Sequence, residues 1–187
     1  MTTPLRLDLG CGPRPKAGFM GIDLCEAPGV VPFDLASGMP WPFEDESVDA
    51  LYSSHLIEHL PAGKIAVHGG TVGSIYWLGQ RDALCWFMDQ AWRVARLGAP
   101  FEIRWPALLD DRTKQICLTA FEDPTHYRFI PASTFVMYFN RQGRKVRGVE
   151  QYPIVCNWRV EYVHQNEYRN GQELVLVENE ARLIKEA

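Results

Sequence analysis

The sequence lacks the segments that would place the protein in a membrane or direct it out of the cell. No uninterrupted apolar stretch approaches the roughly 18 residues that a membrane-spanning helix requires. Residues 1–6 do not combine a basic segment with an apolar one, as a secretory leader does. We therefore expect neither a membrane protein nor a secreted one.

Cysteines that could form a disulfide framework or a zinc knuckle are also lacking. The chain has five cysteines, an odd number, and they are widely spaced with no C-x-x-C pair. This pattern is typical of reduced thiols in a cytoplasmic protein.

Positive charge is scarce where the chain begins. Residues 1–60 hold nine Asp and Glu against three Lys and Arg, whereas the whole chain of 187 residues has a net charge of −4. An acidic surface repels phosphate and suits a cationic small ligand, so we expect no nucleic-acid partner. The composition, 47% hydrophobic and 22% charged, is that of an ordinary globular protein and predicts one domain over residues 1–187.

The hydrophobic pattern predicts an α/β sheet whose ligand-binding edge lies at the carboxyl ends of its strands. Strands are expected at 5–9, 19–24, 30–34, 48–52 and 101–105, and helices at 54–60, 82–97 and 133–139. Ser54 and Ser133 are the expected helix caps. Residues 61–80 are rich in glycine and predict an insertion or a mobile lid over the acceptor. A tight reversal at Asn170-Gly171 predicts a C-terminal antiparallel hairpin.

Candidate ligand-binding residues follow the first four strands. Gly10 and Gly12 let the backbone approach a ligand closely because they have no Cβ. Asp23 is placed to accept hydrogen bonds from a ribose diol, and Asp34 to accept one from an exocyclic amine. The fourth strand brings Ser53, Ser54 and His55 to the same edge.

Six short segments in order resemble those of class I S-adenosylmethionine-dependent methyltransferases of the small bacterial and phage type. They are L-D-L-G-C-G (7–12), G-I-D (21–23), D-L (34–35), P-F-E-D-E-S-V-D (42–49), S-H-L-I-E-H (54–59) and D-P-T-H (123–126). The likeness covers residues 5–60 well and 83–139 moderately. Each motif alone is weak, and their order and spacing carry the resemblance.

The resemblance implies a Rossmann-like, seven-stranded sheet, mostly parallel, with S-adenosylmethionine lying across the strand tips. Asp8, Gly10 and Gly12 would surround its methionine part, Asp23 its ribose and Asp34 its adenine. The residues that the resemblance adds to this donor-binding set are Cys11, Leu24, Leu35, Ser54 and His55. Carboxylates independently suit this donor, because it carries a sulfonium and an ammonium group.

The chain departs from the resemblance between its first two strands. Only 15 positions separate Asp8 from Asp23, and Pro13 and Pro15 interrupt them, so the first helix is expected to be missing or very short. A dinucleotide such as NAD needs that helix end for its pyrophosphate, and the deletion therefore counts against an NAD enzyme. We expect Arg14 and Lys16 to contact the donor carboxylate instead.

Two histidines are the candidate catalytic residues, because imidazole can accept a proton near neutral pH. His126 and His55 are each expected to assist direct displacement of a methyl group onto an oxygen or nitrogen acceptor, most simply a small molecule or a sugar. Residues 55–59 also spell the zinc-peptidase pattern H-x-x-E-H. The pattern lies where the methyltransferase motif predicts it, so we expect no metal ligands.

Other functions remain open at this stage. The chain has no D-P-P-Y or N-P-P-Y segment after the fourth strand and no Pro-Cys pair, which disfavours methylation of nucleic-acid bases. A non-catalytic interaction protein with the same fold is compatible with the short chain and its missing helix. The sequence indicates neither the acceptor nor the oligomeric state.

Overall fold

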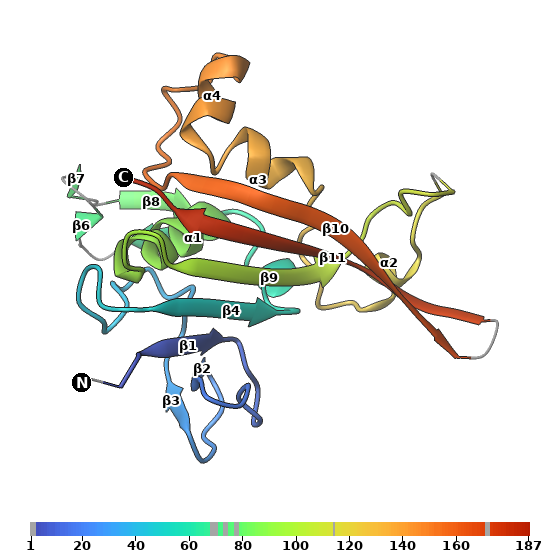
Figure 1. The fold of residues 1–187 in the computed structure, drawn as a ribbon, viewed down its shortest axis with the longest axis horizontal. Coiled ribbons are helices and arrows are strands. Elements are labelled where there is room, and N and C mark those ends of the chain that lie inside the picture. Colours follow the sequence, from blue (N-terminus) through green and yellow to red (C-terminus); the bar gives the residue numbers. More distant parts are fainter. Residues whose placement is uncertain (1–2, 68–70, 73–74, 77–78, 114, 171–172) are drawn as a thin grey trace.

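A seven-stranded sheet forms the centre of the computed structural model, which describes residues 3–67, 71–72, 75–76, 79–113, 115–170 and 173–187 (Figure 1). The strand order is β10-β11-β9-β4-β1-β2-β3. The bounds are Arg6–Leu9 for β1, Met20–Asp23 for β2, Val30–Pro32 for β3, Ala50–Ser54 for β4, Pro100–Pro106 for β9, Trp158–Asn170 for β10 and Glu173–Lys185 for β11. β3, β2, β1, β4 and β9 run parallel, whereas β11 is antiparallel to both of its neighbours. The predicted fold class is confirmed.

Helix α1 (Ala83–Val94) packs its apolar side against one face of the sheet. The carboxylate of Asp82 caps it by accepting hydrogen bonds from the amides of Leu84 and Cys85. Phe87 stands in the buried core and its ring lies 6.2 Å from that of Phe101 in β9. The other helices are the 3-10 helix η1 (Ile57–His59), α2 (Thr119–Glu122), α3 (Ser133–Met137) and α4 (Arg141–Arg147). None of the helices that the structure describes is long and apolar enough to cross a bilayer.

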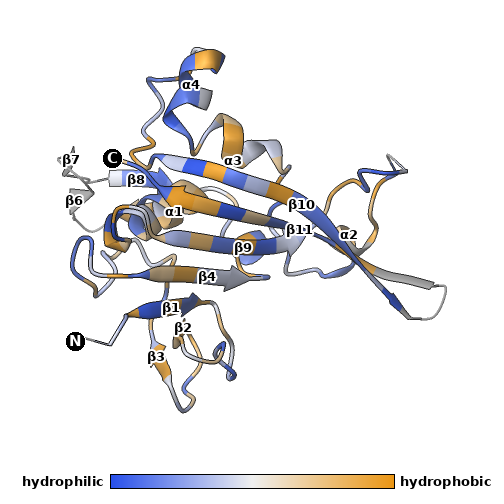
Figure 2. Cartoon of the chain, in the orientation of Figure 1, coloured by the Kyte–Doolittle hydropathy of each residue, from blue (hydrophilic) through white to orange (hydrophobic). Residues whose placement is uncertain are grey.

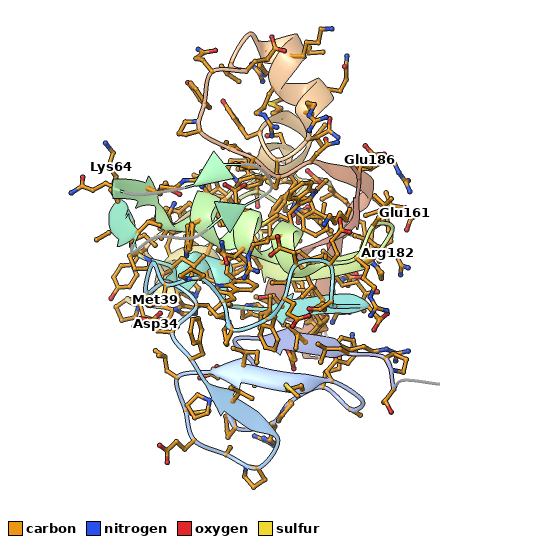
Figure 3. The ribbon with its side chains drawn as sticks, turned by 90° about the vertical axis from the view of Figure 1, so that its left-hand side faces the viewer. Asp34, Met39, Lys64, Glu161, Arg182 and Glu186 are labelled. Atoms are coloured by element: carbon orange, nitrogen blue, oxygen red, sulfur yellow. The ribbon has the colours of Figure 1, made fainter. Side chains whose placement is uncertain are left out.

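The sheet face opposite α1 carries charged pairs between strands. Arg182 bonds Glu102 at 3.1 Å and Glu161 at 2.8 Å, and Arg104 bonds Glu180 at 2.9 Å. Figure 2 shows the matching alternation of hydrophilic and hydrophobic residues along β10 and β11, and Figure 3 shows Arg182 and Glu161 on the side away from Asp34 and Lys64. Because successive strand residues point to opposite faces, this pattern lets one face meet solvent while the other forms the core.

The first helix is missing, as the sequence predicts. Residues 10–19, all described, form turns between β1 and β2. Without that helix, the turn after β1 is short and leaves the carboxyl ends of β1 and β2 accessible.

The helix expected at 54–60 is only the three-residue η1. Ser54 is still in β4, paired with Arg104, and does not cap η1, whose N-cap Leu56 has no side-chain cap bond. His55 has φ of 54°, a left-handed turn that separates strand from helix. Ser133 likewise begins α3 as its first residue instead of capping it.

Residues 61–80 form small ribbons where they are described. β5 (Lys64–Val67) pairs with β8 (Gly79–Asp82), and β6 (Thr71–Val72) with β7 (Ile75–Tyr76). The predicted lid motion stays a prediction, since residues 68–70, 73–74 and 77–78 lie outside the described part. The predicted reversal after Asn170 also falls outside it, at residues 171–172.

Candidate functional site

The turn after β1 requires glycine at its first position. Gly10 has φ of 72°, and its amide donates to the carbonyl of Ile22 at 2.8 Å. A Cβ at Gly10 would stand 2.7 Å from Cδ1 of Leu56, which is closer than side chains pack. The tip of β1 therefore lies directly against Leu56, with a cavity on either side.

The first cavity has a volume of about 310 Å³ and combines acidic groups with apolar walls. Gly10 lines it together with Asp23, Leu24, Phe33, Asp34, Leu35, Ala36, Leu56, His59, Leu60 and Pro61. Leu24 is 74% exposed. An exposed leucine beside two carboxylates suits a nucleoside, because the leucine can pack against the flat base and the carboxylates can accept hydrogen bonds from the sugar.

Asp23 is held in place by the backbone around it. Its Oδ2 accepts the amide of Gly12 at 2.8 Å and its Oδ1 the amide of Cys25 at 3.0 Å. Burial alone would raise the pKa of Asp23, but these amide hydrogen bonds outweigh it and lower the pKa. The carboxylate therefore stays charged and keeps lone pairs for further hydroxyl donors.

Asp34 lies beyond the end of β3 and is exposed. Its Oδ1 accepts the amide of Ala36 at 2.8 Å, which closes a turn. Leu35, 5% exposed, follows it in the core. Asp34 thus closes this turn and also lines the first cavity, together with Asp23.

The second cavity has a volume of about 400 Å³ and mixes charges of both signs. It is lined by Asp8, Gly10, Cys11, Arg14, Lys16, Tyr52, Ser54 and Arg104. Asp8 is 4% exposed, and its Oδ2 accepts the amide of Lys16 at 2.7 Å. Burial raises the pKa of Asp8 despite that bond. A ligand with a cationic group at one end and an anionic group at the other would find an oppositely charged side chain for each of them in the second cavity.

Cys11 packs beneath the turn. A Cβ at Gly21 would stand 2.5 Å from the Cys11 sulfur. Burial, together with the nearby charges of Asp8 and Asp23, raises the pKa of Cys11 to about 11. The thiol is therefore protonated at neutral pH and is no nucleophile.

His55 lies between two buried carboxylates. Its Nε2 is 3.0 Å from Oε2 of Glu178 and its Nδ1 is 3.1 Å from Oε1 of Glu58. Carboxylates only accept hydrogen bonds, so both ring nitrogens donate. The bonds to Glu178 and Glu58 outweigh burial and raise the pKa of His55 to about 9. His55 therefore keeps its proton at neutral pH, and this geometry does not supply the proton acceptor that the sequence predicts there.

His126 lies on the other side of Glu58, beside His59. The two imidazole rings are 4.8 Å apart in a T-shaped arrangement. Glu58, His59 and His126 each offer a ligand atom within 4.8 Å of the others, and they could hold a metal ion. His59 also lines the first cavity. His55 and His126 thus both lie near Glu58.

A search of solved structures finds likenesses over nearly the whole chain. A S-adenosylmethionine-dependent methyltransferase from Archaeoglobus fulgidus has a TM-score of 0.56 at 14% identity, over 97% of this chain and 86% of that one. One from Methanosarcina mazei has a TM-score of 0.55 at 12% identity, over 99% and 94%. The chain has the class I methyltransferase fold.

A further structure with this methyltransferase fold was solved with small molecules bound. It is the 1,6-didemethyltoxoflavin-N1-methyltransferase of Burkholderia thailandensis, with bound 1,6-didemethyltoxoflavin and S-adenosylhomocysteine. Its TM-score is 0.52 at 11% identity, over 97% of this chain and 71% of that one. No protein-family model matches the sequence, and no curated protein does.

Two charged residues of the site were missed by sequence reasoning. Glu178 of β11 is 3% exposed and accepts from His55 and, at 2.7 Å, from the hydroxyl of Tyr168. Arg104 of β9 lines the second cavity and lies 3.8 Å from Glu178. The available signal was charge at alternate positions of two strands, at Glu102 and Arg104 in β9 and at Glu178, Glu180 and Arg182 in β11.

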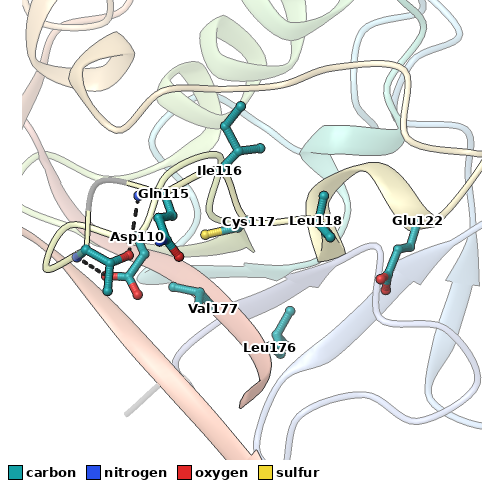
Figure 4. Close-up of a pocket in the computed structure, with 9 residues that line it drawn as sticks. Asp110, Gln115, Ile116, Cys117, Leu118, Glu122, Leu176 and Val177 are labelled. Atoms are coloured by element: carbon teal, nitrogen blue, oxygen red, sulfur yellow. Dashed lines mark hydrogen bonds between the residues drawn. The ribbon is translucent and has the colours of Figure 1, made fainter. Parts of the chain in front are cut away.

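Another cavity lies beyond the end of β9, away from Gly10. Figure 4 shows the residues that line it, which come from the segment after β9 and from β11. Its volume is about 260 Å³. Cys117, Leu118 and Val177 give it apolar walls, and Asp110 stands at one end. None of the residues in the methyltransferase motifs lines it, so the two cavities at Gly10 form the candidate donor site.

Proposed function

We propose that this protein transfers a methyl group from S-adenosylmethionine to an oxygen or nitrogen of a small molecule or a sugar. The observation that carries the proposal is the pair of cavities that meet at Gly10. One has apolar walls and the carboxylates of Asp23 and Asp34, and the other has Arg14 and Asp8.

The residues present suit each part of the donor. Asp23 has free lone pairs for the ribose hydroxyls, and Leu24 and Leu35 offer apolar surface to the adenine. Arg14 would hold the donor carboxylate and Asp8 the ammonium group. When bound, S-adenosylmethionine supplies an electrophilic methyl group on a positively charged sulfur. A dinucleotide is disfavoured, because no helix follows β1 to receive a pyrophosphate.

The protein's own residues would position the acceptor and remove its proton. In this proposal Nε2 of His126 accepts the proton as the acceptor oxygen or nitrogen attacks the methyl carbon. His55 keeps its charge and fixes Glu58 and Glu178. Holding both reactants beside Gly10 makes up most of the catalysis, because in-line displacement depends on orientation.

The 1,6-didemethyltoxoflavin bound to the neighbour supports a small acceptor. The net charge of −4 and the nine acids among residues 1–60 argue against a nucleic-acid substrate. The five cysteines are unpaired, which supports a reducing, cytoplasmic location.

Calorimetric titration with S-adenosylmethionine, S-adenosylhomocysteine and NAD tests the proposal. We expect one site for each of the first two ligands and none for NAD. The variant Asp23→Ala should lose most of this affinity, whereas Asp111→Ala, in the loop before α2, should keep it. Binding of NAD alone would indicate an oxidoreductase. No binding of any of the three would favour a non-catalytic interaction protein.

A further inference from the structure

Three side chains beside the first cavity could act together as ligands of one metal ion. They are Glu58 and His59 of η1 and His126 of the loop after α2, and their ligand atoms lie within 4.8 Å. The sequence pattern H-x-x-E-H suggests a different pair, His55 and His59. That pair does not form, because both ring nitrogens of His55 bind carboxylates.

The hydrogen bonds of His59 fix its tautomer. Its Nδ1 lies 3.1 Å from the carbonyl oxygen of Thr125 and 3.0 Å from the hydroxyl oxygen of the same residue. The carbonyl can only accept, and the hydroxyl donates its own proton to Asp123 at 2.6 Å. Nδ1 of His59 therefore carries the proton, and Nε2 carries a lone pair.

The same logic applies to His126. Its Nδ1 lies 2.9 Å from the carbonyl oxygen of Ala120, so Nδ1 donates and Nε2 has the lone pair. A histidine that donates its second N–H to a backbone carbonyl has the arrangement found behind metal ligands. The side chain of His126 is 8% exposed, so this imidazole is largely shielded from bulk water.

Glu58 completes the set with a buried oxygen. Its side chain is 2% exposed and its Oε1 accepts from His55. Its Oε2 is buried and finds no hydrogen-bond donor among the residues that the structure describes. An unpartnered carboxylate oxygen costs free energy when buried, and a bound cation would remove that cost.

We propose that Glu58, His59 and His126 bind a divalent first-row transition-metal ion such as Mn²⁺ or Zn²⁺. Two imidazole nitrogens and one carboxylate oxygen are a common donor set for such ions, with positions left for water or substrate. Ligand atoms around one ion stand about 3.0–3.5 Å apart. Side-chain movements of about an ångström would therefore bring the three ligand atoms within reach of one ion. Asp123, whose Oδ2 is 3.8 Å from Nε2 of His126, stands next to the ion site.

The backbone holds the two halves of the site together. The carbonyl oxygen of Glu58 accepts the amides of Tyr127 at 2.9 Å and Arg128 at 3.1 Å. These bonds fasten the segment that carries His126 onto η1. The ligands therefore come from two chain segments whose relative position is fixed before an ion arrives.

The site's role rests on the proposed function, although ion binding itself does not. His59 lines both the ion site and the first cavity. A hydroxyl of the acceptor that binds the ion would lose its proton to water more readily. A lone pair of the deprotonated oxygen would then form the bond to the methyl carbon. At the same time the carbon–sulfur bond would break, and its electron pair would stay on the sulfur. With the ion bound, Nε2 of His126 would be a metal ligand and not the base, and the proton of the acceptor would pass to water instead.

Metal titration of the full chain tests the inference. Protein stripped with EDTA is titrated with MnCl₂ and ZnCl₂ in a calorimeter, without methyl donor. We expect one equivalent of ion. Loss of an outer-shell partner alone costs about 10–100-fold in affinity, so His126→Ala and His59→Ala should each cost at least about 100-fold. Glu58→Gln should do the same. His164→Ala is the matched control, because His164 is an exposed histidine on β10, and it should bind as wild type does.

Thermal unfolding by circular dichroism and S-adenosylhomocysteine titration accompany each variant. The inference is overturned if the wild type binds neither ion. It is also overturned if the folded variants His126→Ala and His59→Ala bind the ion as tightly as wild type, because the ion would then be held elsewhere, for example by cysteines. S-adenosylhomocysteine binding without ion binding removes the metal site and leaves the proposed function standing. Ion binding without S-adenosylhomocysteine binding removes the proposed function and leaves the metal site standing.

Discussion

Substituting Leu24 separates the donor site from the stability of the fold. Leu24 is 74% exposed, so Leu24→Ala should leave the free energy of unfolding within about 0.5 kcal/mol of wild type. The substitution removes about three carbon groups, each contributing about 0.8 kcal/mol when fully buried. An adenine ring would cover only one side of the leucine, roughly half of that contribution. We therefore expect a loss of about 1 kcal/mol, or about fivefold in Kd.

The assay is calorimetric titration with S-adenosylhomocysteine, paired with urea unfolding. Leu97→Ala is the matched control, because Leu97 is 63% exposed and follows α1, close to the start of β9. It should change neither measurement. Equal Kd values for Leu24→Ala and wild type would refute the placement of the adenine, as would an equal loss in both variants.

Three further predictions test the fold and the site by substitution. Asp89→Ala should cost about 3–5 kcal/mol in urea unfolding, because fully buried Asp89 pairs with buried Arg81 at 2.6 Å. Asp23 has a lowered folded pKa, so its contribution to stability is present above the unfolded value of about 3.9 and is lost as pH falls through the folded one. Asp23→Asn should therefore flatten the acid limb of the stability curve, and an unchanged limb would contradict this. Gly10→Ala should lower S-adenosylhomocysteine affinity and also cost more stability than Gly12→Ala. Both have positive φ, but only the Cβ at Gly10 meets a neighbour, at 2.7 Å; equal effects would contradict the packing.

Local sequence patterns were sufficient to predict the sheet. Alternating and continuous apolar runs marked the strands, and Pro13 and Pro15 showed that the first helix is missing. The helix expected from Ser54 fell short for a tertiary reason. Ser54 pairs with Arg104 in the sheet, and His55 turns away to bind two carboxylates. Neither contact is visible in the segment's own sequence.

Asp23 and Asp34 could be predicted to line a common cavity, because each lies at or just beyond the carboxyl end of a parallel strand, where side chains come together. The surroundings of the histidines could not. Glu178 is 123 positions from His55 in the chain, and it comes from an antiparallel strand whose register the sequence does not specify. His126 was expected as a lone base, yet its relation to Glu58 and His59 depends on how residues 123–128 lie over η1.

A crystal structure grown with S-adenosylhomocysteine is the most direct test of the account. It should show the ligand across the tip of β1, with its ribose on Asp23, its adenine against Leu24 and its amino acid end beside Asp8 and Arg14. Electron density for the ligand in the cavity between residues 110–122 and β11, and none at Gly10, would contradict the account.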